Sequence, residues 1–382
     1  MNPNAEFDLI VYGATGYTGR LVAEYLGQRY GVGGEVKWAM AGRSAAKLEQ
    51  VRDELGLPKD TPLIVADADD PASLAAMVAR GKAIVTTVGP YQLYGEPLVA
   101  ACVKAGADCL DLCGEPNWMA HVIGAYDAAA KASGARIVHS AGFDSIPFEL
   151  GVCFAQETAK ARLGAYVPRV KGRLRAMAGG MSGGTAASGA ATMAAIQKDP
   201  SLIALMMNPF ALTPGFTGPP QPPGNAVEHD EDVGADVGPF MMAAINTKNV
   251  HRSNALQGHP WGTDFAYDEM AVVTPGAPEV FAMGADAPKP GEGPSKAERE
   301  AGFYDVAFIA VAPDGRKVKV SVKGDRDPGY GSTSKMLAEA AICLVTDAKT
   351  APGGVWTPGA VMGSKLIERL QANAGLTFAV EG

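Results

Sequence analysis

The feature that most constrains this fold is the glycine loop Gly13–Gly19, which reads Gly-Ala-Thr-Gly-Tyr-Thr-Gly. The apolar run Leu9–Tyr12 precedes it, and the helical pattern Arg20–Leu26 follows it. A strand that turns through glycines into a helix directs free backbone N–H groups at an anion. The glycines allow a tight turn, the close approach of a pyrophosphate and the packing of the helix on the sheet. We therefore predict a dinucleotide site, with an ordinary strand-to-helix turn as the alternative. Its predicted residues are Gly13, Thr15, Gly16, Tyr17, Thr18 and Gly19.

Short β-rich runs alternate with helical patterns from the N-terminus to Ser140. Ser44 and Asp70, the latter followed by a proline, are placed to cap two of the helices. Six strands with helical crossovers predict an α/β fold, the doubly wound parallel sheet of the Rossmann type. The predicted strands are Asp8–Tyr12, Val36–Ala41, Leu63–Ala66, Ala83–Val88, Asp108–Leu112 and Arg136–Ser140.

The alternation stops after Ser140, and a chain of 382 residues exceeds the usual size of a single core. We predict a Rossmann domain over residues 1–147 and an inserted α+β substrate domain, built on an antiparallel sheet, over 148–330. Helices within 331–382 are expected to pack back on the first domain. The predicted elements after Ser140 are the helices Ile146–Leu163, Ala186–Gln197, Ser332–Val345 and Gly363–Gln371, the strand Arg169–Met177, and a hairpin of Tyr304–Val311 with Arg316–Lys323.

Two segments of the second domain carry unusual compositions. The proline-rich segment Pro209–Gly224 can form neither a helix nor a central strand, so we expect a surface excursion. The acidic run His229–Asp232 predicts a solvated loop, with a metal site as the alternative.

The end of the second strand distinguishes the two nicotinamide cofactors. An NAD enzyme usually places a carboxylate there for the ribose 2′-hydroxyl, whereas this chain has Arg43 followed by Ser44. A guanidinium and a hydroxyl suit the 2′-phosphate of NADP(H), which we predict as the cofactor. Asp67 accepts from the adenine amino group or is a plain turn residue. Gly89 and Pro90 give a rigid backbone on the nicotinamide side.

Charge and hydropathy exclude several classes of protein. The formal charge of −8 leaves no basic stripe for nucleic acid, and no apolar run is long enough to span a membrane. Residues Met1–Glu6 lack the start of a secretory signal, so we expect a cytoplasmic protein. An odd number of cysteines within apolar stretches is typical of a reducing compartment, and we expect no bound metal. A homodimer is compatible with the sequence but not required by it.

Ordered motifs occur along nearly the whole chain, at residues 13–20, 41–44, 89–91, 95–99, 111–115, 142–147, 183–185, 327–336 and 353–358. Together they resemble the saccharopine dehydrogenase-like oxidoreductases, and most closely their trans-acting enoyl reductase branch, known from actinobacterial lipid biosynthesis. The resemblance implies an NADP-dependent reductase with a Rossmann domain and an inserted α+β substrate domain. It does not fix the substrate.

Hydride transfer requires a proton donor near the developing negative charge. Tyr91 is our first candidate, because a phenol donates without a large pKa shift; the alternative is a tyrosine packed beside Pro90. Glu115 is a further candidate catalytic residue, with a hydrogen bond to the cofactor ribose or carboxamide as its expected role, and Asp144 either caps the following helix or takes part in catalysis. Tyr94 and Ser145 are the other polar residues expected near the nicotinamide. No Tyr-x-x-x-Lys pair occurs, which argues against a short-chain dehydrogenase mechanism.

Methionines concentrate in the second domain, where unbranched side chains suit an apolar pocket for a lipid- or polyketide-like substrate. A saccharopine- or opine-type amino-acid substrate would need converging cations, for which Arg169, Arg173 and Arg175 are candidates. A non-catalytic NADP-binding sensor or scaffold is a further alternative. The methionines include Met177, Met181, Met206, Met207, Met241 and Met242.

Overall fold

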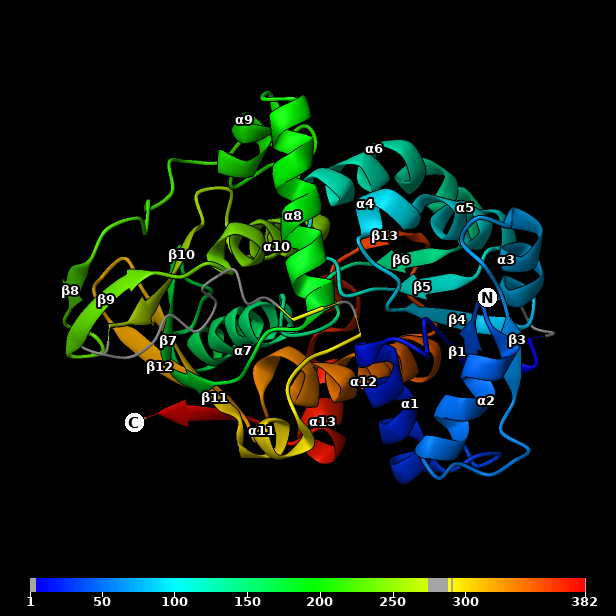
Figure 1. Ribbon diagram of the computed structural model, residues 1–382. Helices are drawn as coiled ribbons and strands as arrows, with labels where there is room; N and C mark the ends of the chain where they lie inside the picture. Colours follow the sequence, from blue (N-terminus) through cyan, green and yellow to red (C-terminus); the bar gives the residue numbers. More distant parts are fainter. Residues whose placement is uncertain (1–4, 274–287, 290, 382) are drawn as a thin grey trace.

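The computed structural model describes residues 5–273, 288–289 and 291–381. Residues 1–4, part of the segment on which the expectation of a cytoplasmic protein rests, lie outside this range, as do residues 274–287 and 290 of the predicted second domain. Two seven-stranded sheets organise the described chain, side by side in Figure 1. None of the helices in the described ranges is long and apolar enough to cross a membrane.

The first sheet is entirely parallel, with the order β13-β6-β5-β4-β1-β2-β3. Strands β1 to β6, the first six along the chain, have the order of the doubly wound fold predicted from the sequence. The strands are β1 (Phe7–Tyr12), β2 (Trp38–Gly42), β3 (Leu63–Val65), β4 (Gly81–Thr86), β5 (Asp108–Leu110), β6 (Arg136–Val138) and β13 (Gly354–Trp356). The helices that connect the first six are α1 (Tyr17–Tyr30), α2 (Ala45–Glu54), α3 (Pro71–Val78), α4 (Tyr91–Tyr94), α5 (Glu96–Ala105) and α6 (Pro116–Ser133).

Both faces of this sheet are buried, as the sequence of β1 shows. Leu9 and Val11 belong to the core that includes residues of α1 and α2, whereas Ile10 and Tyr12 belong to the core that includes residues of α3, α5 and α6. Alternate side chains of a strand point to opposite faces, so the near-continuous apolar run covers both. The predicted caps are confirmed, because the side chains of Ser44 and Asp70 accept from the N–H groups of Lys47 and Ala72.

The second sheet has the order β14-β12-β11-β7-β10-β9-β8. It is mixed and not antiparallel as predicted, because β10 pairs in parallel with β7. The predicted hairpin is confirmed as β11 and β12. The strands are β7 (Arg169–Ala178), β8 (Glu228–Asp230), β9 (Ala235–Pro239), β10 (Ala266–Val272), β11 (Phe303–Val311), β12 (Lys317–Gly324) and β14 (Leu376–Glu381). The remaining helices are α7 (Ile146–Leu163), α8 (Gly183–Lys198), α9 (Leu202–Met207), α10 (Ala243–Leu256), α11 (Lys296–Ala301), the π-helical turn η1 (Pro328–Ser332), α12 (Thr333–Thr346) and α13 (Pro358–Asn373).

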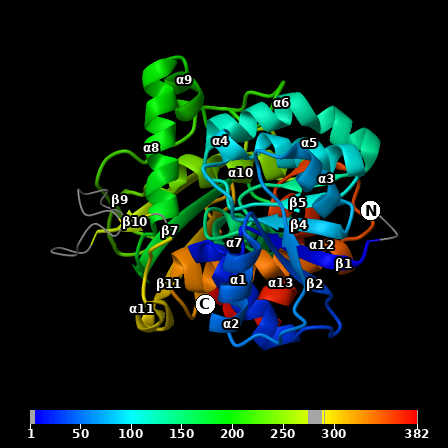
Figure 2. The ribbon, with the colours of Figure 1, turned by 45° about the vertical axis from the view of Figure 1, so that its right-hand side comes forward.

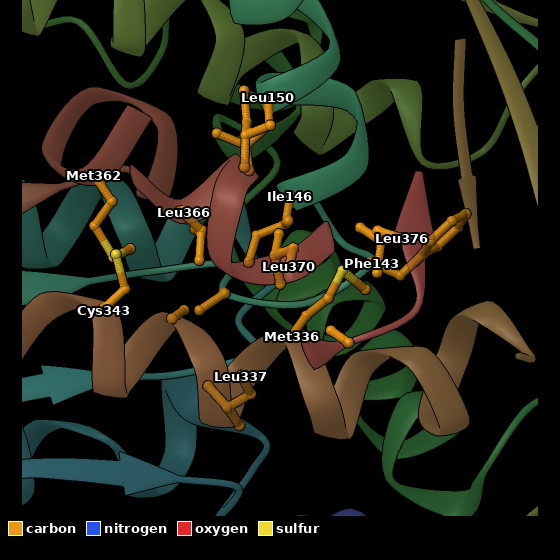
Figure 3. Close-up of a cluster of buried hydrophobic side chains, with 14 of the residues drawn as sticks. Phe143, Ile146, Leu150, Met336, Leu337, Cys343, Met362, Leu366, Leu370 and Leu376 are labelled. Atoms are coloured by element: carbon orange, nitrogen blue, oxygen red, sulfur yellow. The ribbon is translucent and has the colours of Figure 1, made fainter. Parts of the chain in front are cut away.

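The C-terminal helices connect the cores of the two sheets. Helix α12 contacts α1, β1 and β4, while α13 contacts α7, which in turn covers β11 and β12. Figure 3 shows their shared apolar cluster, in which Met336 of α12 lies near Leu370 of α13. The last residues also supply an edge strand to each sheet, because β13 pairs with β6 and β14 with β12. The limits of the predicted domains stay a prediction.

Two predictions for loops of the second domain were wrong. The acidic run is not a solvated loop, because β8 carries Asp230 into contact with Lys171 and Arg173 at 2.8 and 2.7 Å. Burial raises the pKa of Asp230, but the hydrogen bonds from these two cations outweigh it and lower the pKa to about 2. The proline-rich segment is not purely a surface excursion either, since Phe210, Leu212 and Thr213 are buried.

Within the described residues, no group of three or more His, Cys, Asp or Glu side chains is arranged to hold a metal ion.

Candidate active site

The glycine loop joins β1 to α1 at the carboxyl edge of the first sheet. Gly13 has a φ of +91°, and a Cβ there would lie 2.7 Å from Oγ1 of Thr87. A Cβ on Gly19 would lie 2.2 Å from the carbonyl oxygen of Gly13, so only glycine lets the helix approach the turn this closely. The Gly16 N–H donates to that same oxygen, 2.9 Å away. These contacts give each glycine a steric or conformational reason.

The N-terminus of α1 leaves its backbone donors free. No side chain caps it, its first turn holds no acidic residue, and its first backbone bond runs from the Arg20 N–H to the Gly16 carbonyl oxygen at 3.0 Å. Among the described residues, the N–H groups of Tyr17, Thr18 and Gly19 have no hydrogen-bond partner. Free donors at the positive end of a helix form an anion site, so the loop fits the phosphates of a dinucleotide.

Residues predicted to contact the adenosine half lie at the ends of β1, β2 and β3. Arg43 is exposed and makes no hydrogen bond or ion pair with any other described residue. Thr15 lies beside Gly42, the residue before Arg43, since a Cβ on Gly42 would be 3.7 Å from the Thr15 side chain. Asp67 forms a turn by accepting from the Asp69 N–H at 3.1 Å. Burial and the nearby charge of Asp67 raise the pKa of Tyr12 to about 12, while Arg43 lowers it, so these side chains lie within electrostatic reach of one another.

The predicted proton donor, Tyr91, follows a cis Gly89–Pro90 peptide bond. Its buried hydroxyl donates to the carbonyl oxygen of Thr86 at 3.3 Å and accepts from the Leu112 N–H at 3.1 Å. Burial raises the pKa of this phenol well above its ordinary value. Because the proton of the hydroxyl is already engaged by the backbone, the geometry favours the structural role that the sequence left open for Tyr91.

Glu115 is 2% exposed and organises the turn that carries Tyr91. Its Oε1 accepts from the Tyr91 N–H at 3.0 Å and from the Ser188 hydroxyl at 2.9 Å, and its Oε2 accepts from the Gln92 N–H at 2.9 Å. These bonds satisfy the first donors of α4 and join α8 to it. Glu115 is thus a positioning residue at the wall of the site.

Asp144 does not cap the following helix, contrary to one of its two predicted roles. Helix α7 begins after Ser145 with no side-chain cap, and the Ser145 hydroxyl accepts from the Asn249 amide at 2.9 Å. The Asp144 carboxyl lines a cavity instead. Burial, and to a lesser extent the charge of Asp111, raise its pKa to about 7. A carboxyl with this pKa exchanges a proton near neutral pH.

The cavity has a volume of about 480 Å³ and combines a polar end with an apolar end. Thr18, Thr87, Gly89, Glu115 and Asp144 lie at the end next to the glycine loop. Helices α8, α9 and α10, together with the residues just before α10, supply the other end. Figures 1 and 2 show α8 standing clear of both sheets with α9 at its tip. The apolar lining includes Met181, Met193, Met206, Met241, Met242 and Ile245.

Some predicted site residues are not brought together, and others were missed. Tyr94 is 45% exposed and does not line the cavity, and neither does the buried Ser145. Tyr330 and Ser188 do line it but were not assigned a role from the sequence. Tyr330 accepts from the Ser182 N–H at 2.6 Å, which ties η1 to the start of α8. The available signal for Ser188 was its spacing from Thr185 and Thr192 on a helix otherwise rich in glycine and alanine.

Several known proteins are similar to this chain in sequence or in fold. Residues 9–138 match the model of the saccharopine dehydrogenase NADP binding domain. A putative trans-acting enoyl reductase of Mycobacterium tuberculosis is 38% identical over 98% of this chain and 97% of the relative. A trans-acting enoyl reductase of Mycobacterium ulcerans is 35% identical over 96% of each. The apo saccharopine dehydrogenase (L-Glu forming) of Saccharomyces cerevisiae shares the fold, with a TM-score of 0.59 and 9% identity over 98% of this chain and 100% of that one.

Proposed function

The chain belongs to the saccharopine dehydrogenase-like family of NADP-dependent oxidoreductases, together with the trans-acting enoyl reductases, and from this premise we propose that it reduces an activated C=C or C=O bond in an apolar, lipid- or polyketide-like substrate. NADPH supplies the hydride when it is bound. The residues of this chain then have three tasks: to hold the dinucleotide, to admit the substrate and to provide the proton.

The glycine loop supports the first task. Tyr17, Thr18 and Gly19 present free N–H groups, and the space that a Cβ would fill at Gly13 and Gly19 is taken by the surrounding backbone and Thr87. We assign the pyrophosphate to these groups and the 2′-phosphate to Arg43, with the Ser44 hydroxyl beside it. Asp67, Gly89 and Pro90 complete the cofactor site in this proposal.

Asp144 is the proposed proton donor. Reduction of the double bond adds a hydride to one of its atoms and a proton to the other. With a pKa of about 7, Asp144 holds a proton for much of the time at neutral pH and can release it to the atom that becomes negative. We therefore assign the proton to Asp144 in place of Tyr91, whose hydroxyl proton is already engaged by Thr86.

The distribution of charge supports an apolar substrate. The three arginines that could have bound the carboxylates of an amino-acid substrate are each ion-paired on the second sheet: Arg169 with Asp268, Arg173 with Asp230 and Asp268, and Arg175 with Asp305 and Glu381. Methionines dominate the distal lining of the cavity, and their unbranched side chains adapt to irregular apolar chains.

The decisive experiment follows NADPH oxidation with a panel of enoyl thioesters, enones and keto acids. Turnover of enoyl thioesters or enones with apolar chains is expected, and it should decrease strongly in Asp144→Asn. Turnover confined to the keto acids would support a saccharopine-type activity instead. Tight NADPH binding without oxidation of any compound would favour a sensor or scaffold.

A further inference from the structure

A second cavity, of about 330 Å³, lies between α1, α11 and the start of α12, and we refer to it as the α1–α11 groove. None of its lining residues lines the methionine-rich cavity. The turn η1 and the first residues of α12 separate the two: Gly329, Tyr330 and Thr333 line the cavity, whereas Gly331 and Lys335 line the groove. The groove is therefore a distinct site and not an extension of the proposed active site.

The charge of the groove is opposite to that of the chain. Its lining holds five cationic side chains and two carboxylates, although the formal net charge of the protein is −8. One of the carboxylates, Glu24, accepts from the amide of Gln28, which also lines the groove. The cationic residues are Arg29, Lys296, Arg299, Arg326 and Lys335.

The described residues neutralise these cations weakly. Lys296 is 3.9 Å from Glu300, and Arg326 and Lys335 share Asp325 at 3.4 and 3.7 Å. Arg29 donates to the neutral Asn373 side chain at 2.6 Å, and Arg299 donates to the Tyr17 hydroxyl at 3.0 Å. By contrast, Arg173 on the second sheet contacts two carboxylates at 2.7 and 2.8 Å. The charge of the buried Asp327 also acts on Arg299, yet the cations still outnumber the carboxylates in the lining of the groove.

The fold holds part of this cluster together. Arg299, Arg326 and Lys335 are only partly exposed. A Cβ on Gly331 would lie 3.1 Å from Cβ of Arg326 and 3.2 Å from the backbone oxygen of Arg299, so the glycine lets the two arginine-bearing segments meet. Burial lowers the pKa of Lys335, and the charge of Arg326 adds to this effect against the opposing influence of Asp325. An anion in the groove would relieve this repulsion.

We propose that the α1–α11 groove binds a phosphorylated small molecule other than the dinucleotide, with Arg299, Arg326 and Lys335 around its phosphate. One guanidinium group can donate two parallel hydrogen bonds to two oxygens of the same phosphate, and the ammonium group of a lysine adds a compact positive charge beside it. The volume is that of a small-ligand site and exceeds what a bare phosphate needs. Leu21 and the Tyr25 ring offer a less polar wall for the rest of the ligand.

The test titrates inorganic pyrophosphate, and separately inorganic phosphate, into protein saturated with NADP⁺ and follows the heat of binding. Saturation occupies the dinucleotide site, so the heat reports another site. We expect about one pyrophosphate per chain, and a dissociation constant at least about tenfold higher in the double variant Arg326→Gln, Lys335→Gln. Raising the salt from 50 to 200 mM should weaken binding.

A matched control removes two exposed charges elsewhere, in Lys37→Gln, Lys198→Gln, and should bind as the unchanged protein does. Circular dichroism and thermal unfolding verify that both double variants are folded. The proposal is overturned if neither anion binds, if both double variants bind equally well, or if saturation with NADP⁺ abolishes binding.

Discussion

The hydroxyl of Ser188, on α8, donates a hydrogen bond of 2.9 Å to the buried carboxylate of Glu115, which also holds the N–H groups of Tyr91 and Gln92. One turn further along α8, Thr192 accepts from the Gln92 side chain at 3.2 Å. Helix α8 is thereby attached to the turn after the fourth strand, and the substrate end of the cavity is attached to its cofactor end.

Glu115→Gln should destabilise the protein more than Ser188→Ala. An amide group that replaces one carboxylate oxygen faces a donor it cannot pair with, which costs about 1–3 kcal/mol, whereas loss of the Ser188 hydroxyl removes one bond worth about 0.5–1.5 kcal/mol. Urea unfolding of both variants and of the double variant measures this. A double variant whose loss equals the sum of the two single losses would contradict a shared network.

Asp144→Asn should lower the reductase rate by about 100-fold or more, because the group that supplies the proton is removed. In the unchanged protein the rate should decrease as the pH rises through about 7, where Asp144 loses its proton. The rate of the variant should lack this dependence. A pH profile that is the same in both proteins would exclude Asp144 as the proton source.

The same substitution should affect stability with a definite sign. The folded-state pKa of Asp144 lies above its ordinary value of 3.8, so the associated stability is present below pH 4 and is lost as the pH rises through about 7. At pH 8 the asparagine variant should therefore be more stable than the unchanged protein, by an amount on the order of 2 kcal/mol after allowance for partial solvent access. Chemical unfolding at pH 5 and pH 8 tests this, with a smaller difference expected at pH 5.

Tyr91→Phe distinguishes the two roles of this tyrosine. Its hydroxyl serves the Leu112 N–H and the Thr86 carbonyl, so its removal should cost about 1–3 kcal/mol of stability. The rate should change by less than about tenfold, since Asp144 still supplies the proton. A loss of more than about 100-fold at unchanged stability would restore Tyr91 as the donor.

Arg43→Ala should weaken NADPH binding by about 10- to 100-fold and leave NADH binding nearly unchanged, because only NADPH carries the 2′-phosphate. Since Arg43 is exposed and pairs with no described residue, stability should change by less than about 0.5 kcal/mol. Fluorescence titration with both cofactors makes the comparison, with Arg80→Ala as a control on a half-buried arginine that pairs with Glu6. Equal weakening of both cofactors would refute the assignment.

Two neighbouring methionines offer a matched pair for the substrate pocket. Met206 lines the cavity, whereas Met207 is 77% exposed and does not. Met206→Gln should raise the KM for an apolar enoyl substrate by about 5- to 10-fold with little change in kcat, since it removes about 1 kcal/mol of apolar contact. Met207→Gln should leave KM unchanged. Steady-state kinetics with a long-chain enoyl thioester compares them, and equal effects would argue against substrate in this part of the cavity.

Local signals predicted much of the first sheet. The glycine loop, the Ser44 and Asp70 caps and the six parallel strands each depend on residues close together in the chain. The seventh strand, β13, was not predicted, because three residues more than 200 positions from β6 carry no sign of their partner. The burial of Asp230 escaped prediction for the same reason, since Lys171 and Arg173 lie more than fifty residues away.

At the site, the sequence found Glu115 and Asp144 but could not separate their roles. The order Asp144-Ser145-Ile146-Pro147 is typical of a helix cap, and only the packing of Asn249 against Ser145 shows that the carboxyl is free of this task. The raised pKa of Asp144 depends on burial and on the charge of Asp111, more than thirty residues away, which no local pattern encodes.

The two edge strands contributed by the last residues have a consequence for how the chain is made. Residues 354–356 pair with β6 and residues 376–381 pair with β12, so that β6 and β12 become interior strands of their sheets. During synthesis on a ribosome, both of these strands therefore stay unpaired on one side until the final part of the polypeptide emerges. A nascent chain stalled before residue 350 would expose β6 and β12 at the same time, so premature termination should lead to aggregation or proteolysis and not to a folded, cofactor-binding fragment.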